Sequence, residues 1–225
     1  MATRRKVNNL ERRLIEASAN DNMSLVVLLI ANGVDANATD PDGRTALHHI
    51  VRQNDAEGVR FLVGEERQTT GRYGIMYRGI AALDENAAHE FALNVSSVNL
   101  ADNEGNRAIH FAALNDNSEI IGILASHGGN IDAKNNAGAT ALHYAARHGH
   151  MHALVEIIRL EADIDARDKE GMAPIHYAAN SNRIDAARYL KKIGADIASL
   201  NNSGNSPYEL ALWQGYERMA KMLRR

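Results

Sequence analysis

The feature that most constrains this chain is an internal repeat with a fixed period. The segments GNRAIHFAA, GATALHYAA and GMAPIHYAA are variants of one pattern, and they begin at Gly105, Gly138 and Gly171. Gly204 continues this constant spacing of 33, and GRTALHHIV repeats the pattern from Gly43. A fixed period of this length predicts supersecondary units that stack on one another, because each is too small to bury its apolar face alone.

Each repeat carries the signals of a turn followed by two short helices. The glycines lie in stretches rich in Asp and Asn, where a residue that tolerates positive φ favours a turn. Thr45, Thr140 and Ser206 are good helix N-caps, and Pro174 and Pro207 suit the first helical position, where a missing N–H has little cost. The first helix is rich in alanine, so a neighbour can approach it closely, and the second carries paired apolar residues. The pattern predicts stacked helix pairs around a continuous apolar core.

This period and pattern closely resemble the ankyrin-repeat family, whose unit of about 33 residues carries a T-P-L-H-x-A signature. The resemblance implies an all-α fold, an ankyrin-repeat solenoid of stacked helix-turn-helix units with short β-hairpin turns. It also implies that the repeat histidine forms hydrogen bonds within and between units. We expect a single domain over residues 1–225, with about seven units. Their expected bounds are an N-terminal capping unit at about 8–39, repeats at 40–66, 102–134, 135–167 and 168–200, and a C-terminal capping unit at 201–225.

Residues 67–101 interrupt the register, because the step from Gly43 to Gly105 is 62, which is one period of 33 plus 29. Two interpretations are open: a degenerate repeat that has lost four residues from its turn, or a surface insertion of this extra length. The sequence favours the degenerate repeat, because Met76 and Tyr77 then fall on the leucine and histidine positions of the pattern. Apolar residues also fit the second helix that would follow.

A cluster of histidines raises the question of a metal site. His143, His148, His150 and His152 lie within ten positions of the chain. His143 matches the repeat histidine, and His150 matches the position that begins the second helix. Only His148 and His152 are peculiar to this repeat, and two imidazoles without neighbouring carboxylates rarely bind a metal. We therefore interpret the cluster as a feature of the repeat, and expect no metal and no cofactor.

No pattern in the chain indicates catalysis. The chain has no cysteine, which excludes a thiolate nucleophile and cysteine-ligated metals. The segment GRYGIMYRG lacks the Gly-Lys-Ser/Thr ending of a phosphate loop. Asp84, Glu85, His89 and Glu90 fit a solvated helix face better than an active site. We expect a protein that is not an enzyme, and a catalytic site within 67–95 is the remote alternative.

Charge and hydropathy narrow the expected partners. A formal net charge of −3 and a pI near 6.4 give no electrostatic reason to expect nucleic acid. The longest apolar run, LVVLLIA, is too short to span a bilayer, and the basic start MATRRKVNNL is not followed by the apolar run of a signal peptide. We expect a cytoplasmic protein without membrane or nucleic-acid partners, and delivery into a host cell stays open. Polar outer faces on the two capping units favour a monomer.

By the family resemblance, a partner protein or peptide is expected on the concave face. Contacts would come from residues that flank the turn glycines and from the ends of the first helices. The expected contact residues are Arg44, Arg52, Gln53, Asn106, Leu114, Asn115, Arg147, His148, Met172, Asn180 and Trp213.

Three places in this set stand out. Trp213 is the only tryptophan, and truncation of interface tryptophans often costs ~2 kcal/mol or more. Leu114 occupies a position where a polar residue is expected, and Arg147 with His148 suits an acidic group. The structural alternatives are that Trp213 covers the end of the core, that Leu114 packs under the neighbouring turn and that Arg147 is a solubilising charge. The expected function is a protein–protein interaction module (an adaptor, regulator or effector), and the alternative is a dedicated inhibitor or immunity-type protein that blocks an enzyme.

Overall fold

The computed structural model describes residues 9–65, 73, 75–76 and 96–224. Within them it contains twelve α-helices and one isolated antiparallel bridge, between Thr39 and Thr45. The prediction of an all-α fold is confirmed for this part of the chain. The chain divides into two compact units, Met1–Asn103 and Glu104–Arg225, and each is described by itself.

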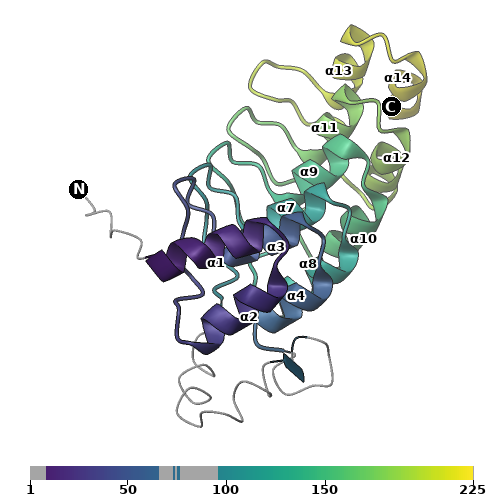
Figure 1. Cartoon of the computed structure of the whole chain (residues 1–225). Helices are drawn as coiled ribbons and strands as arrows, with labels where there is room; N and C mark the ends of the chain where they lie inside the picture. The colour runs from purple at the N-terminus through teal and green to yellow at the C-terminus, as the bar shows by residue number, and fades with distance from the viewer. Residues whose placement is uncertain (1–8, 66–72, 74, 77–95, 225) are drawn as a thin grey trace. The chain divides into compact units, whose positions relative to one another are not determined.

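In its described residues the first unit contains two helix pairs (Figure 1). Helix α1 pairs with α2, α3 pairs with α4, and α1 also packs against α3. The side chains of Leu14, Ile30, Leu47, Ile50 and Phe61 are fully buried between these helices. The helix bounds are α1 (Asn9–Ala19), α2 (Met23–Ala31), α3 (Ala46–Arg52) and α4 (Ala56–Leu62).

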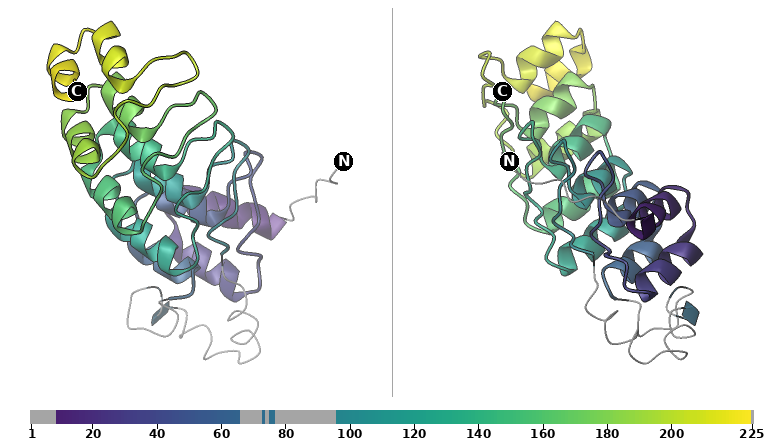
Figure 2. Two further views of the ribbon diagram at one scale, coloured as in Figure 1. Left: turned by 180° about the vertical axis from the view of Figure 1, so that it is seen from behind. Right: turned by 60° about the vertical axis from the view of Figure 1, so that its left-hand side comes forward.

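The second unit stacks four helix pairs in two layers (Figures 1 and 2). The first helices of the pairs pack in sequence and form one layer, and the second helices form the other. The turns that lead into the first helices project together from one side (Figure 2). The first helices are α7 (Ala108–Leu114), α9 (Ala141–His148), α11 (Pro174–Asn180) and α13 (Pro207–Trp213). The second helices are α8 (Ser118–Ser126), α10 (Met151–Arg159), α12 (Ile184–Lys192) and α14 (Glu217–Leu223).

The repeat histidine links the first helices α7, α9 and α11 to the turn that follows in the next repeat. His143 Nδ1 accepts the backbone N–H of Thr140, 3.1 Å away, and its Nε2 lies 3.0 Å from the carbonyl oxygen of Met172. Because a carbonyl can only accept, the imidazole carries its proton on Nε2. His110 and His176 make the same contacts to the carbonyls of Ala139 and Ser199. The expected hydrogen bonds within and between repeats are thus present in the second compact unit. Burial lowers the pKa of all three histidines.

An Asp or Asn side chain closes each turn. Asn135 Oδ1 accepts from the backbone N–H groups of Ala137 and Ala139, both at 3.0 Å. Gly138 lies inside this turn at φ +81°, and a Cβ added there would come 2.8 Å from the backbone nitrogen of Lys169. Neighbouring turns are also joined by a backbone bond, from Lys169 N–H to the Ala137 carbonyl over 3.0 Å. Close approach of two backbones is therefore one reason for glycine here.

A hydrogen bond at the end of α4 shows how residues 67–101 relate to the repeats. Ser96 donates its backbone N–H to the carbonyl of Leu62 over 2.9 Å. In the other repeats the equivalent bond joins residues five positions apart, whereas Leu62 and Ser96 are 34 apart, an excess of 29. The equivalent bonds are Val34 to Leu29, Gly129 to Leu124, Ala162 to Ile157 and Ala195 to Leu190.

The turn that follows Ser96 lies directly beside the turn of Gly43. Asn103 donates its backbone N–H to the carbonyl of Asp42 over 2.8 Å, as Lys169 does to Ala137 between adjacent repeats. No turn of a further repeat fits between two turns joined in this way. These bonds favour the surface insertion over the degenerate repeat that the register alone favoured.

Tyr73 and Met76 give a second argument against the degenerate repeat. Its register put Met76 at the leucine position, whose occupants Leu47, Ile109, Leu142 and Ile175 are all buried in first helices. Met76 instead is half-buried, and its sulfur is 4.0 Å from the hydroxyl of Ser24 in α2. Tyr73 packs edge-on against Phe61 of α4, with ring centroids 6.3 Å apart. The expectations for Tyr77, Asp84, Glu85, His89 and Glu90 concern residues outside the described part of the chain.

None of the helices that the structure describes is both long and apolar enough to cross a membrane.

Candidate partner-binding surface

The ends of the first helices present a row of side chains along one edge of the second unit. The row consists of Leu114, Arg147, Asn180 and Trp213, which recur at the repeat period, and we call it the helix-end row. Arg147 is exposed, Leu114 is 38% exposed and Trp213 is 74% exposed. Asn180 is half-buried, and its Oδ1 accepts from Gln214 Nε2 over 2.9 Å. The structure thus places the three singled-out side chains on one repeated position.

The exposure of Trp213 argues against a purely structural role for it. A side chain with three quarters of its surface in water covers little of the end of a core. Leu114 is also too exposed to lie wholly under a neighbouring turn. Tryptophan and arginine are enriched among the residues that dominate binding at interaction sites, and Trp213 and Arg147 are both exposed in this row.

Beside the row lies a cavity of about 100 Å³ that sequence reasoning missed. It is lined by Asn135, Ala137, Ala139, His143, Tyr144, Arg147 and Tyr177. Tyr144 and Tyr177 are half-buried, and each packs edge-on against the histidine of the preceding repeat, with ring centroids 5.9 and 5.4 Å apart. The aromatic residue after each histidine in HFAA, HYAA and HYAA was the available signal.

Hydrogen bonds fix both tyrosines. The Tyr177 hydroxyl donates to Asp168 Oδ2 over 2.7 Å, and Tyr144 donates to Asn106 Oδ1 over 3.3 Å. Burial, followed by the bond to Asp168, raises the pKa of Tyr177 far above its usual value. The cavity therefore has walls held in one conformation, which lowers the entropy lost when a ligand binds.

Two of the expected contact residues are buried and do not offer their side chains to a partner. Asn106 is 4% exposed, because its Oδ1 accepts from Asn135 Nδ2 (2.9 Å) and from Tyr144 in the next repeat. Met172 is 7% exposed, and its sulfur accepts from Asn201 Nδ2. The expectation of side-chain contacts with a partner at these two positions is corrected, because both side chains face the next repeat.

The expected contacts of the first unit are partly engaged within the unit. Gln53 Nε2 donates to the carbonyls of Ser18 and Ala19 at the end of α1, over 2.7 and 3.0 Å. Arg44 pairs with Asp42 at 2.9 Å and lies 3.8 Å from Asp102. Arg52 is exposed.

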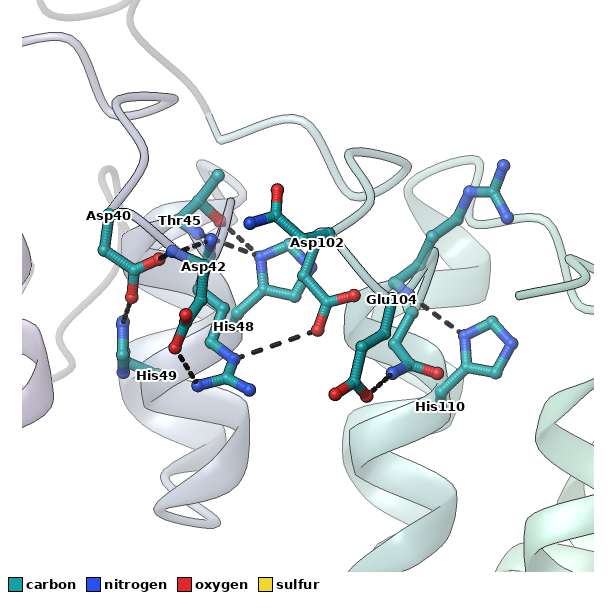
Figure 3. A network of polar contacts seen from close by, with 12 residues as sticks. Asp40, Asp42, Thr45, His48, His49, Asp102, Glu104 and His110 are labelled. Carbon is teal, nitrogen blue, oxygen red and sulfur yellow. Dashed lines mark hydrogen bonds and ion pairs between the residues drawn. The ribbon is translucent and has the colours of Figure 1, made fainter. Parts of the chain in front are cut away.

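Figure 3 shows the polar network around these residues. His49 Nε2 lies 3.0 Å from Asp40 Oδ2, and Thr45 donates its backbone N–H to His48 over 3.0 Å. This network ties the turn to α3, so these residues serve the fold of the first unit before any partner is considered.

The histidine cluster is divided among separate contacts. Both nitrogens of His143 are engaged with backbone, as described above, and His150 is the N-cap residue of α10. The rings of His148 and His150 stack with centroids 5.4 Å apart, and His152 Nδ1 lies 2.9 Å from Asp116 Oδ2. In the described residues, no group of three or more His, Asp or Glu side chains is arranged to hold a metal ion.

Of the remaining expected residues, Asn115 is the C-cap of α7 and is half-buried, and His148 is exposed at the end of α9.

A comparison with protein families adds an independent finding. A family model described as ankyrin repeats (3 copies) matches residues 14–77, 76–168 and 151–225.

Proposed function

Because this chain belongs to the ankyrin-repeat family, we propose that it is a protein–protein interaction module whose partner is held against the helix-end row and the adjoining turns of the second unit. Ankyrin repeats are in general modules for protein binding, and typically have no enzymatic activity. A repeat signature specifies how units stack and leaves the ligand to the variable positions.

The observation that carries the proposal is the exposure of Trp213, 74%, at the last position of its first helix. Leu114 and Arg147 occupy the same position in other repeats, so one extended partner segment running along the row would meet all three. The cavity between Tyr144 and Tyr177 lies next to Arg147 and supplies a pocket for one partner side chain. Aromatic and arginine anchors beside preformed pockets are typical of interaction hot spots.

The proposal is tested by capture of partners on immobilised protein. A variant with Leu114→Glu, Arg147→Glu and Trp213→Ala changes the row, and circular dichroism checks that it folds. The matched control, Val155→Glu with Lys192→Glu, makes the same change in net charge on the layer of second helices. A protein retained by wild type and control but lost by the row variant supports the proposal; equal retention by all three contradicts it.

The captured protein also decides between the two kinds of binding protein. Several partners of modest affinity support an adaptor, regulator or effector. One tight complex that abolishes an enzymatic activity supports a dedicated inhibitor. Sedimentation of the free chain tests the accompanying proposal that it is a monomer.

A further inference from the structure

We propose that a second cavity, adjacent to the helix-end row, receives an acidic side chain of the partner. This inference rests on the proposed function, and it names the chemistry that the partner brings. The cavity has a volume of about 310 Å³ and is lined by His148, Gly149, Met151, Asn182, Arg183, Ile184, Asp185 and Ala186. It lies where the end of α9 meets the start of α12, next to Arg147 of the row.

Positive charge gathers at this cavity without a matching carboxylate from the described residues. Arg183 lines it and is exposed, and its Nε donates to the backbone carbonyl of Arg147 over 3.1 Å. Arg147 itself lies at the edge of the cavity, beside His148 of the lining. In the described part of the chain neither arginine forms an ion pair. The only acid in the lining, Asp185, is paired with Arg188 at 2.7 Å.

The titration of His148 is consistent with this excess of positive charge. Burial lowers the pKa of His148, and the nearby charges of His150, Arg147 and Arg183 lower it further. A carboxylate entering the cavity would favour the charged imidazole and would raise this pKa. The pKa of His148 is thus a reporter of what occupies the cavity.

One repeat earlier, the chain places its own carboxylate at the equivalent position. Asp116 lies one repeat period before Gly149, and it contacts His152 Nδ1 (2.9 Å) and the backbone N–H of Ala153 (2.8 Å). Gly149 has no side chain, and Ala186, the counterpart of Ala153, lines the open cavity. A Cβ added to Gly149 would come 3.1 Å from Cδ of Arg183, so Arg183 reaches over the place that a carboxylate on residue 149 would occupy.

The test uses a defined probe, the peptide acetyl-Glu-Glu-Leu-Glu-Glu-amide, with its Gln counterpart as the neutral control. Binding to the full chain is followed by NMR, through the amide of Gly149 and the ring protons of His148. We expect the acidic peptide to shift both and to raise the pKa of His148, and the Gln peptide to do neither. Inorganic phosphate at equal ionic strength is the third probe; a response to phosphate alone overturns the proposal.

Two substitutions test whether the acidic peptide binds at this cavity. Arg183→Gln should weaken binding of the acidic peptide about fivefold, the size expected for one partly exposed ion pair. Lys192→Gln, which removes an exposed charge from the same helix outside the cavity, should leave binding unchanged. Equal effects of the two substitutions would mean general charge attraction and would overturn the proposal.

A substitution at Gly149 is the most discriminating experiment. Gly149→Asp would fill the cavity with the chain's own carboxylate, and Asp116 shows that Asp adopts the required positive φ, +56° against +73° for Gly149. Gly149→Asn fills the same volume without the charge. Asp must weaken peptide binding at least about fivefold more than Asn, again the scale of one exposed charge pair; equal effects contradict the proposal.

The two proposals fail separately. If the peptide leaves Gly149 and His148 unmoved while the row variant still loses the captured partner, the acidic-site inference is wrong and the proposed function stands. If the peptide binds as expected but the row variant captures partners as wild type does, the proposed function is wrong.

Discussion

The side chain of Asn37 accepts the backbone N–H of Ser97 over 2.7 Å, although 60 residues separate them. The same contact joins Asp132 to Asp163 and Asp165 to Asp196, each over 3.0 Å and each across 31 residues. The bond between Asn37 and Ser97 therefore matches the bonds that join adjacent turns elsewhere in the chain.

Cross-linking tests whether the turns of Asn37 and Ser97 are adjacent. The chain has no cysteine of its own, so introduced cysteines are the only thiols. We expect the pair Asn37→Cys and Ser97→Cys to be bridged by a bismaleimide that spans one helix spacing, about 10 Å, but not two. The pair Asp132→Cys and Asp163→Cys is the positive control, and Asp132→Cys with Asp196→Cys, two turns apart, is the negative one. A first pair that behaves like the negative control would restore the degenerate repeat.

The turn glycines should differ in their tolerance of a methyl group. Gly138→Ala meets both a positive φ and the backbone of Lys169, so we expect it to lower the free energy of unfolding by ~3 kcal/mol or more. Gly204 has nearly the same φ, +77°, but nothing lies within 4 Å of the added Cβ, and its cost should be ~1–2 kcal/mol. Urea unfolding of both variants measures the difference. Equal costs would mean that close backbone approach contributes nothing at Gly138.

Stability should fall as the pH is lowered through the range of histidine titration. His110, His143 and His176 have pKa values below 6.5 in the folded chain, mainly because burial disfavours the charged ring. Below pH 6.5 the unfolded chain therefore binds more protons, and the stability present above this pH is lost as the pH falls toward the folded-state values. Each such histidine contributes a slope of up to about 1.4 kcal/mol per pH unit.

Urea midpoints between about pH 7.5 and 5 check this expectation. The pKa of Asp116 is also lowered in the folded chain, but its effect belongs near and below about pH 4 and does not overlap. A free energy of unfolding that stays constant across this range would contradict the assignment of neutral, buried histidines.

The sequence was sufficient for the repeat and for its internal chemistry. The spacing of Gly105, Gly138 and Gly171 predicted stacked helix pairs, and the resemblance of His143 to the family histidine predicted its bonds. Both features are local or periodic, so the residues that produce them recur along the sequence at the repeat spacing.

The sequence is less informative about residues 67–101 and about the candidate binding surface. Counting along the chain assigns Met76 to a first helix, because 29 is close to 33 and the apolar pattern fits. The two interpretations are distinguished by contacts between distant residues, such as the bonds from Ser96 to Leu62 and from Asn103 to Asp42. Asn106 and Met172 flank turn glycines as expected, but which side of the turn meets the next repeat depends on three-dimensional packing. The cavity beside Tyr144 was missed for the same reason, since its walls come from two repeats.

The most direct test of the central claim is the affinity of the captured partner for Trp213→Ala, measured by isothermal titration calorimetry. We predict a dissociation constant about 30-fold higher than for wild type, which corresponds to a loss of ~2 kcal/mol at an anchoring tryptophan. Val155→Ala, an exposed apolar side chain in the layer of second helices, should bind like wild type. An unchanged affinity for Trp213→Ala would contradict the claim that the helix-end row holds the partner.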